Sequence, residues 1–589
     1  MKSNKTTCPL DCYDGCSIVY EDGKLKGDKN HLVTKGYLCS KMNKFLKYDR
    51  LKSALYNGKK IDLQEALKVL AEKIHQYKNE NNIFFTGSGN LGRLQNMPKE
   101  FFSKFNFTQC EGSLCDGAGD AGIQEGRGAN LIIPPSQIEN SEVVVIWGRN
   151  IQVSNSHLMP FLKDKKIVVI DPVENTLAKK ADLFLKILPR GDYYLALLVS
   201  RILYISQNED IDFIESKTNN FNDFVELFES IPIKKLSQKC DIPLEAAWEF
   251  AEMITSKKVT FLVGIAVQKY FIGHFVLRAI DSLAAMLGLF GKGGCGVSFL
   301  SNSFYGFKST IASLPNKTDL PTVDFSKYSF TFIQNSNPLV SMPNSKKIKE
   351  GIEKSKFVVY FGLYENETSR LADLVIPAVD FLSKNDIRTT YGHEFIGMMP
   401  KLKESECGIS EYNLTNYLIQ KFFGTNLKSE QEYIAEIVSS NSFTKDGYLA
   451  SKIYEKIPYS DGFYTDDGKF NFLDEFEDDF EQDFEDDNQY YILTIKNKYS
   501  LNSSFKCNNF LYIPPILGYK DEDKVELTSL YGKAEFVVKI DKRLRRDCFL
   551  TYSGNAKYNY LTPSICSLKG TCAVFQELKV SMKKVTIQG

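Results

Sequence analysis

Short, unalternating apolar runs recur through the first two thirds of the chain. They occur at 83–85, 143–147, 167–170, 259–263, 330–333 and 357–361, and each leads into Gly, Asn or Asp within two residues. Strands buried on both faces of a parallel sheet have this pattern, because neither face needs polar side chains. Amphipathic stretches lie between several runs, for example at 195–204 and 244–254. The pattern predicts doubly wound α/β structure in more than one unit.

The two ends of the chain have different patterns. Residues 62–78 carry apolar side chains at helical spacing and predict a helix. Residues 466–487 are strongly acidic, which favours a solvated linker or loop over a docking element. Beyond them, short strand-like runs at 490–495, 524–530 and 535–540 alternate with turns. The C-terminal part is therefore expected to be rich in β-structure.

Composition excludes some classes of protein. A chain of 589 residues is too long for one hydrophobic core and predicts three or four domains. Its 73 basic residues equal its 73 acidic ones, so no global field favours nucleic acid. No run of eighteen apolar residues appears, so no transmembrane segment is expected. A cysteine at position 8 leaves no room for a cleaved export signal, and thirteen scattered cysteines fit a reducing compartment. We therefore expect a cytoplasmic protein.

Four cysteines near the N-terminus form a candidate metal centre. Cys8, Cys12, Cys16 and Cys39 are spaced C-x3-C-x3-C-x22-C. Three thiols on one tight loop and a fourth from a distance match the four ligands of a [4Fe-4S] cluster. A zinc ion is the alternative, but zinc sites usually show two close pairs of ligands. The spacing favours the iron–sulfur cluster.

From this cluster onward the chain resembles the molybdopterin oxidoreductases, the family of formate dehydrogenases, nitrate reductases and S- or N-oxide reductases. The likeness follows the family's order through the segments 8–16, 36–41, 147–150, 155–160, 169–172, 278–281, 291–296, 335–338, 372–377, 391–393 and 501–505. One such motif alone is weak, but their shared order is a specific signal. The resemblance implies a molybdenum enzyme, with tungsten as the alternative metal.

The resemblance also implies a fold and its domains. The expected fold is multidomain α/β, with an N-terminal Fe–S domain, two doubly wound Rossmann-like domains and a C-terminal six-stranded β-barrel. We place the Fe–S domain at 1–55, one α/β domain at 56–130 and 325–465, the other at 131–324, the acidic linker at 466–487 and the barrel at 488–589. A bis-molybdopterin guanine dinucleotide is expected to lie across the two α/β domains.

The resemblance implies roles for two residues, one as a metal ligand and one on the path of the electrons. Cys115, in the glycine-rich segment 111–119, falls where the family binds molybdenum, and a soft thiolate suits a metal already held by dithiolene sulfurs. Cys110 is the rival, although its surroundings match less well. Lys41 falls between cluster and pterin in the family, where a cation would stabilise negative charge during electron passage; an exposed lysine is the alternative.

Further residues are candidate cofactor ligands because they match the family's motifs or follow predicted strands. They are Gly148, Asn150, Asp171, Gly191, Asp192, Gln268, Asn335, Asn337, Glu367, Thr368, Asn502 and Ser503. Nucleotides bind beyond the carboxyl ends of strands in doubly wound sheets, and these positions supply polar groups there. Taken singly, each one could instead be a residue that forms a turn.

The expected reaction is two-electron redox chemistry on a small substrate, namely an S- or N-oxide, a sulfur oxyanion or a formate-like molecule. Single electrons would pass through the cluster to a separate Fe–S, flavin or ferredoxin-like protein. Asp116 and His157 are candidate proton carriers, although a structural role is the more common one for a histidine such as His157, His274 or His393. Formate dehydrogenases usually carry His where Asp116 stands. The alternatives are an electron-transfer subunit that lost molybdenum, a non-redox molybdenum or tungsten hydratase, and a structural zinc protein.

Overall fold

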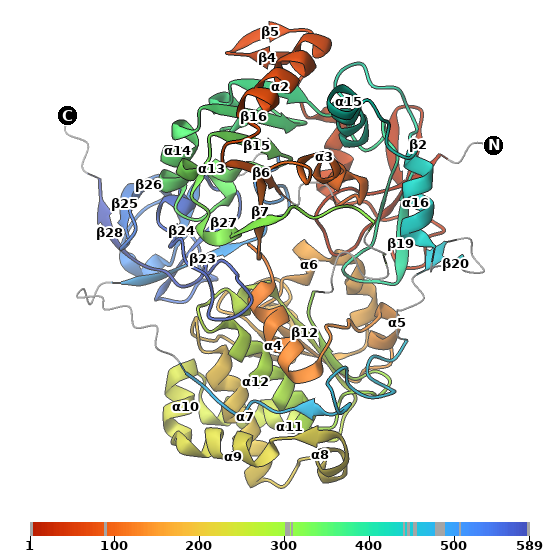
Figure 1. Cartoon of the computed structure of the whole chain (residues 1–589). Helices are drawn as coiled ribbons and strands as arrows, with labels where there is room; N and C mark the ends of the chain where they lie inside the picture. The colour runs from red at the N-terminus through yellow and green to blue at the C-terminus, as the bar shows by residue number, and fades with distance from the viewer. Residues whose placement is uncertain are drawn as a thin grey trace.

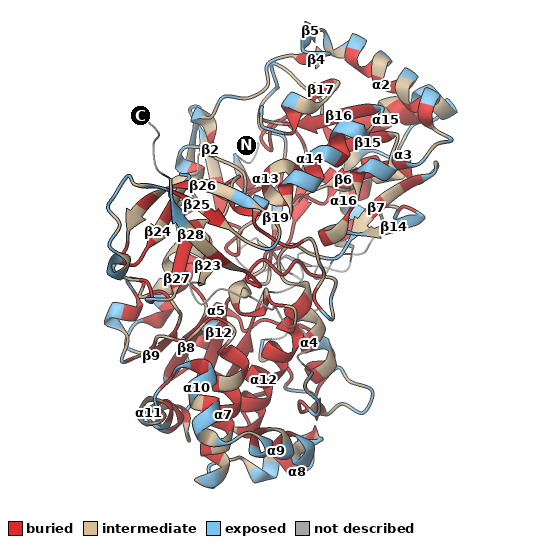
Figure 2. Ribbon diagram, turned by 90° about the vertical axis from the view of Figure 1, so that its left-hand side faces the viewer, coloured by how far each residue is buried: buried red, intermediate tan, exposed pale blue. Residues whose placement is uncertain are grey.

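The protein is described by a computed structural model. It describes residues 4–87, 91–300, 307, 310–439, 442–443, 448–450, 456–477, 489–505 and 508–585. Two largely parallel sheets lie toward opposite ends of the molecule in Figure 1, and a β-barrel lies beside them. Buried residues concentrate inside these layers, and exposed ones lie mainly on the outer helices (Figure 2).

The first sheet has five parallel strands. Their order is β10 (Leu183–Leu185), β9 (Lys166–Ile170), β8 (Val143–Trp147), β12 (Val259–Val263) and β13 (Gly296–Ser298). Every residue of β8 and β12 is buried, as the unalternating sequence predicts. The strand order reverses between β8 and β12, and a crevice at such a switch point is where doubly wound sheets bind ligands.

The second sheet has eight strands, and its neighbours come from distant parts of the chain. Their order is β14 (Asn316–Asp319), β7 (Phe107–Glu111), β6 (Asn82–Thr86), β15 (Phe330–Gln334), β16 (Phe357–Gly362), β17 (Leu374–Pro377), β4 (Ala54–Tyr56) and β5 (Lys59–Ile61). The first six strands are parallel, whereas β4 and β5 form an antiparallel edge. Because β6 pairs with β15, residues 82–86 and 330–334 share one sheet.

Further β-structures accompany these two sheets, among them a barrel and an N-terminal sheet. The barrel closes through β23 (Tyr490–Ile495), β27 (Cys548–Tyr552), β24 (Phe510–Ile513), β26 (Lys533–Ile540), β25 (Lys524–Thr528) and β28 (Lys579–Lys584). Near the N-terminus, β1 (Lys5–Thr7), β2 (Ser17–Glu21) and β3 (Lys24–Gly27) form an antiparallel sheet. The predicted fold class, multidomain α/β with a six-stranded C-terminal barrel, is confirmed. The division into domains stays a prediction.

The helices agree closely with the amphipathic patterns. The helix predicted at 62–78 is α2 (Leu63–Tyr77), which begins where the Asp62 side chain accepts a hydrogen bond from the amide of Glu65. The stretch at 244–254 is α11 (Leu244–Ile254), and 195–204 lies within α7 (Asp192–Ile205). None of the helices in the described ranges is long and apolar enough to cross a bilayer.

The described part of the acidic segment differs from a solvated linker. There β22 (Phe470–Asn471) pairs with β11 (Thr218–Asn219), and the side chains of Phe470, Phe472 and Leu473 are fully buried. The aromatic residues between the acidic ones bury apolar area in the core of the first α/β unit, which stabilises this packed course. Residues 478–487 of the predicted linker lie outside the described residues.

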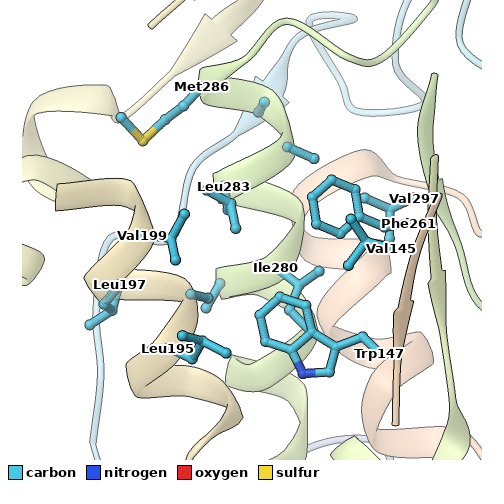
Figure 3. Packing of buried hydrophobic residues seen from close by; sticks show 14 of the residues in the cluster. Val145, Trp147, Leu195, Leu197, Val199, Phe261, Ile280, Leu283, Met286 and Val297 are labelled. Atoms are coloured by element: carbon cyan, nitrogen blue, oxygen red, sulfur yellow. The ribbon is translucent and has the colours of Figure 1, made fainter. Parts of the chain in front are cut away.

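The core of the first α/β unit lies between its sheet and two helices. Trp147 and Phe261 project from β8 and β12 toward Ile280 of α12 (Gly273–Met286), and α12 in turn packs against α7 (Figure 3). All fourteen residues of α12 are buried. A helix that is buried all round is held by packing on every side, so substitutions in it are costly.

We expect Ile280→Ala to lower the free energy of unfolding by about 2–5 kcal/mol, because it removes buried methylenes and leaves a cavity. Ile205→Ala is the matched control, since Ile205 at the end of α7 is 56% exposed, and a surface change costs within about 0.5 kcal/mol. Denaturant unfolding followed by tryptophan fluorescence measures both. Equal losses of stability in the two variants would contradict this description of the core.

Candidate functional site

A single cavity of about 1380 Å³ is lined by the carboxyl ends of strands from both sheets, by the cysteine-bearing N-terminal segment and by the barrel. Most of the residues predicted for the site lie on its wall. They are Cys8, Cys12, Cys16, Cys39, Lys41, Cys115, Asp116, Gly148, Asn150, His157, Asp171, Asp192, Asn335, Asn337, Glu367, Asn502 and Ser503. Residues scattered over the whole chain are thus brought to one place.

Hydrogen bonds to backbone carbonyls shape the cysteine loop between β1 and β2. The amide of Cys8 donates to the carbonyl of Cys16 at 2.8 Å, which closes the loop at its base. Fully buried Arg388 donates to the carbonyl oxygens of Cys8 at 2.6 Å, Leu10 at 2.8 Å and Cys12 at 3.4 Å. The guanidinium fork suits this task because it offers several donors in a fixed plane.

A glycine in this loop has a conformation that other residues rarely adopt. Gly15 has φ +48°, and a Cβ there would overlap the side chain of Thr390. The loop therefore runs directly against the 388–390 segment, which carries Arg388. This close approach explains why a glycine stands next to Cys16.

The chemistry of the four thiols fits a metal cluster. Burial raises the pKa of Cys8 and Cys16, and it raises that of Cys12 to about 12. The thiols also influence one another electrostatically, so they lie close together. Buried thiols of this kind become thiolates when a metal neutralises their charge. Within the described ranges, no three His, Cys, Asp or Glu side chains are arranged to hold a single metal ion.

The Cys115 loop connects β7 to α4 (Gly117–Arg127), and its own side chains and a distant glutamine hold it. Ser113 Oγ accepts hydrogen bonds from the amides of Cys115 at 2.8 Å and Asp116 at 3.0 Å. Gln268 Nε2 donates to the carbonyl of Cys115 at 2.7 Å, while its Oε1 accepts from the amide of Gly119 at 2.8 Å. Gln268 lies outside the cavity wall, so it positions the loop from behind.

Two lysines beside Cys115 were not predicted. Lys269 and Lys496 line the cavity and lie within electrostatic range of Cys115. Burial lowers the pKa of Lys269. Burial acts in the same direction on Lys496, but Asp11 and the nearby thiols outweigh it and raise its pKa. Lys269 directly follows Gln268 and Lys496 directly follows the strand at 490–495, but a lysine is ordinarily solvated, so no local signal marks either one.

The carboxyl ends of the first sheet carry two carboxylates withdrawn from water, those of buried Asp192 and half-buried Asp171. Burial raises the pKa of Asp171 and of Asp192 to about 7. Asp192 accepts a hydrogen bond from Trp147 Nε1 at 2.7 Å. Within the part of the chain that the structure describes, Arg149 Nη1 and Asn150 Oδ1 are buried without a hydrogen-bond partner. Buried polar atoms of this kind fit a polar ligand that completes their hydrogen bonds.

The carboxyl ends of the second sheet carry a connected amide network. Asn337 Nδ2 donates to Glu367 Oε2 at 2.8 Å, and Thr368 Oγ1 donates to Asn337 Oδ1 at 2.8 Å. Asn335 has φ +48° and donates to Glu411 Oε1 at 3.1 Å. From the barrel side, Asn502 Nδ2 lies 3.2 Å from a carboxylate oxygen of Asp11.

Several predicted residues lie elsewhere than expected. Gly191, at the start of α7, and Thr368 are not on the cavity wall, and neither is Gln268. His157 lies on the wall, but its ring contacts the thiol of Cys16. His274 is fully buried and burial lowers its pKa to about 3, which makes it a poor proton carrier near neutral pH.

The strand ends of two largely parallel sheets share a cavity with cysteine thiols and a β-barrel. This arrangement defines a large cofactor-binding α/β protein. Residues 58–405, more than half of the chain, match the profile of the molybdopterin oxidoreductases. The chain belongs to the molybdopterin oxidoreductase family.

Known proteins resemble the chain over much of its length. It is 28% identical to the probable oxidoreductase YyaE of Bacillus subtilis, over 80% of this chain and 78% of that protein. It is 26% identical to the F420-dependent formate dehydrogenase subunit alpha of Methanocaldococcus jannaschii, over 64% of each chain. The solved acetylene hydratase from Pelobacter acetylenicus has the same fold, with a TM-score of 0.82 and 15% identity over 99% of this chain and 100% of that one.

Asp192 makes the stability of cofactor-free protein depend on pH. Its pKa in the folded chain, about 7, lies above the ordinary value of 3.8, so the folded state keeps a proton that the unfolded state releases. The free energy of unfolding therefore falls as the pH rises from about 4 to 7 and is constant above that. We expect Asp192→Asn to be more stable than wild type at about pH 8, by up to about 4 kcal/mol, and equally stable near pH 4.

Thermal unfolding of the cofactor-free protein across this pH range measures the difference. Asp223→Asn is the control, because Asp223 is exposed on α9 (Phe221–Ser230). A constant difference between Asp192→Asn and wild type at every pH would rule out the proposed linkage.

Proposed function

We propose that the chain is a molybdenum- or tungsten-dependent oxidoreductase that binds bis-molybdopterin guanine dinucleotide and one [4Fe-4S] cluster. Its reaction is the two-electron oxidation or reduction of a small substrate, an S- or N-oxide, a sulfur oxyanion or a formate-like molecule. One observation carries the proposal: the four N-terminal thiols and Cys115 line the same cavity as the carboxyl ends of both parallel sheets.

The two ends of the cavity match a ligand with two nucleotide arms. Gly148, Asn150, Asp171 and Asp192 would hold one guanine dinucleotide at the first sheet. Carboxylates withdrawn from water need hydrogen-bond donors, which guanine and ribose supply. Asn335, Asn337 and Glu367 would hold the other arm at the second sheet, while Asn502 and Ser503 approach from the barrel.

Cys115 is the proposed ligand of the metal. A thiolate suits a soft site of sulfur donors, and Ser113 and Gln268 fix the backbone that carries it. Lys269 and Lys496 place positive charge beside this thiolate and so offset the negative charge of the buried acids. When bound, the metal centre supplies two-electron chemistry and the cluster passes single electrons. Asp116, whose pKa burial raises, can hold a proton beside Cys115.

Cys8, Cys12, Cys16 and Cys39 are the proposed ligands of the cluster, with Lys41 on the same cavity wall. The formate dehydrogenase relative is named as a subunit, which supports a separate protein as the electron partner. We propose an Fe–S, flavin or ferredoxin-like protein in this role.

Anaerobic purification followed by elemental analysis and dye-linked assays tests the proposal. Iron together with molybdenum or tungsten, and turnover that oxidises or reduces a viologen dye, is the expected result. Formate, S-oxides, N-oxides, nitrate, thiosulfate and polysulfide are the substrates to screen. Iron without molybdenum or tungsten would identify an electron-transfer subunit, and turnover without any change of the dye would identify a hydratase.

Cys115→Ala should lose the metal ligand and with it at least about a hundredfold in activity, as losses around metal sites often reach this size. Iron content should stay unchanged, because the cluster thiols are intact. Cys110→Ala is the matched control, since Cys110 lies on the same wall, five residues earlier. Full activity in Cys115→Ala, or loss only in Cys110→Ala, would refute the assignment.

Arg388→Lys should lower the iron bound per chain by more than half, because an ammonium cannot reach the three carbonyl oxygens that the guanidinium holds together. Arg201→Lys is the control: Arg201 also donates to two carbonyls, those of Phe228 and Ile231, in the helical region. Iron analysis and the visible absorption of the purified proteins give the readout. Equal iron in both variants would show that Arg388 does not organise the cluster loop.

A further inference from the structure

His157 lies directly against a thiol of the cysteine loop. It belongs to the 3-10 helix η3 (Ser156–Leu162), and its Nε2 lies 3.8 Å from the Sγ of Cys16. Both residues are buried, each about 5% exposed. The contact joins the first α/β unit to a proposed cluster ligand 141 positions earlier in the chain.

The other ring nitrogen of His157 faces a carboxylate. Nδ1 lies 2.6 Å from an oxygen of Asp14, which is also buried and is itself part of the cysteine loop. Nε2 faces a sulfur and, at 3.5 Å, the carbonyl of Tyr37. Nδ1 lies against the Asp14 carboxylate, so Nε2 is the ring nitrogen that points to the sulfur of Cys16. Asp14 thereby fixes the orientation of the ring, as carboxylates commonly do for histidines at metal sites.

The neighbouring buried histidines have different surroundings. His31 Nδ1 accepts from the backbone of Thr34, and His393 Nε2 lies 2.9 Å from the carbonyl of Asp14. Those rings satisfy backbone groups, which is the ordinary structural role of a buried histidine. The ring of His157 instead faces a carboxylate on one side and a sulfur on the other. This arrangement indicates a role in tuning the electronic properties of the sulfur ligand.

We propose that His157, oriented by Asp14, donates an N–H···S hydrogen bond to Cys16 and thereby raises the reduction potential of the cluster. The inference rests on the proposed function, because it needs the cluster to be present. Reduction adds one electron to the cluster, and a donor at a ligand sulfur stabilises the added negative charge. No bond of His157 is made or broken in this step, so His157 is a positioning and tuning residue.

The ring of His157 also contacts a tyrosine at the protein surface. Tyr37 packs edge-on against it, with ring centroids 4.8 Å apart, and is 49% exposed. Solvent access changes cluster potentials as well. A test must therefore remove the donor without opening the site, and phenylalanine, with its ring of similar size, does so.

Pulsed EPR on the reduced holoenzyme with ¹⁵N-labelled histidine tests the contact without any substitution. We expect a histidine nitrogen coupled to the cluster, and we expect the coupling to vanish in His157→Phe. A wild-type cluster without nitrogen coupling would overturn this inference and leave the proposed function standing. A wild-type protein that binds no iron would instead refute the proposed function itself.

An EPR-monitored redox titration of holoenzyme variants measures the consequence. His157→Phe should lower the equilibrium constant for reduction about tenfold, or about 59 mV for one electron. His157→Gln keeps an N–H donor, so its reduction potential should lie close to that of wild type. His75→Phe, which replaces an exposed histidine on α2, should leave the potential unchanged. A reduction potential in His157→Phe equal to that of wild type would contradict the proposal. If that variant binds no iron, the presence or absence of nitrogen coupling in the wild-type protein decides whether the proposal holds.

Discussion

The withdrawal of charged groups from water around one cavity is the constraint on which the structure depends. Burial raises the pKa of Asp171 and Asp192 at one sheet and of Asp116 beside Cys115, and it lowers the pKa of Lys269. Each such group costs free energy unless a neighbour or a ligand compensates it. A large polar ligand that reaches both sheets would compensate most of them at once, and the parallel topology delivers them to the same place.

Much of the fold was predictable because burial leaves a direct mark on the sequence. Strands such as β8, β12 and β15 are buried on both faces, so their residues are apolar without alternation. The start of α2 is marked by Asp62, whose side chain caps the helix. Each of these features is determined by residues that are close together in the sequence. The order of the strands follows instead from pairings such as β6 with β15, which no local pattern reveals.

The candidate site was predictable in its members more than in its geometry. The cysteine spacing and the polar ends of the strands identified residues that share the cavity wall, although their roles stay predictions. Lys496 escaped notice because a lysine after a strand is ordinarily solvated, and here the fold half-buries it beside the Cys115 loop. Phe470 was predicted to lie in a solvated linker because acidic residues dominate the composition around it, yet its side chain is fully buried. In both cases tertiary packing overrode the local signal.

The segment that leaves β8 connects the two halves of the candidate site. Within nine residues, Arg149 stacks on the ring of Tyr13 at 4.5 Å, the carbonyl of Ser154 lies 3.7 Å from the thiol of Cys12, and His157 contacts Cys16. The same segment supplies Gly148 and Asn150 to the crevice of the first sheet. Because interiors are close-packed, a ligand that orders this segment in the crevice also orders the wall of the cysteine loop. The crevice proposed for a nucleotide and the loop proposed to hold the cluster are therefore linked through one short stretch of chain.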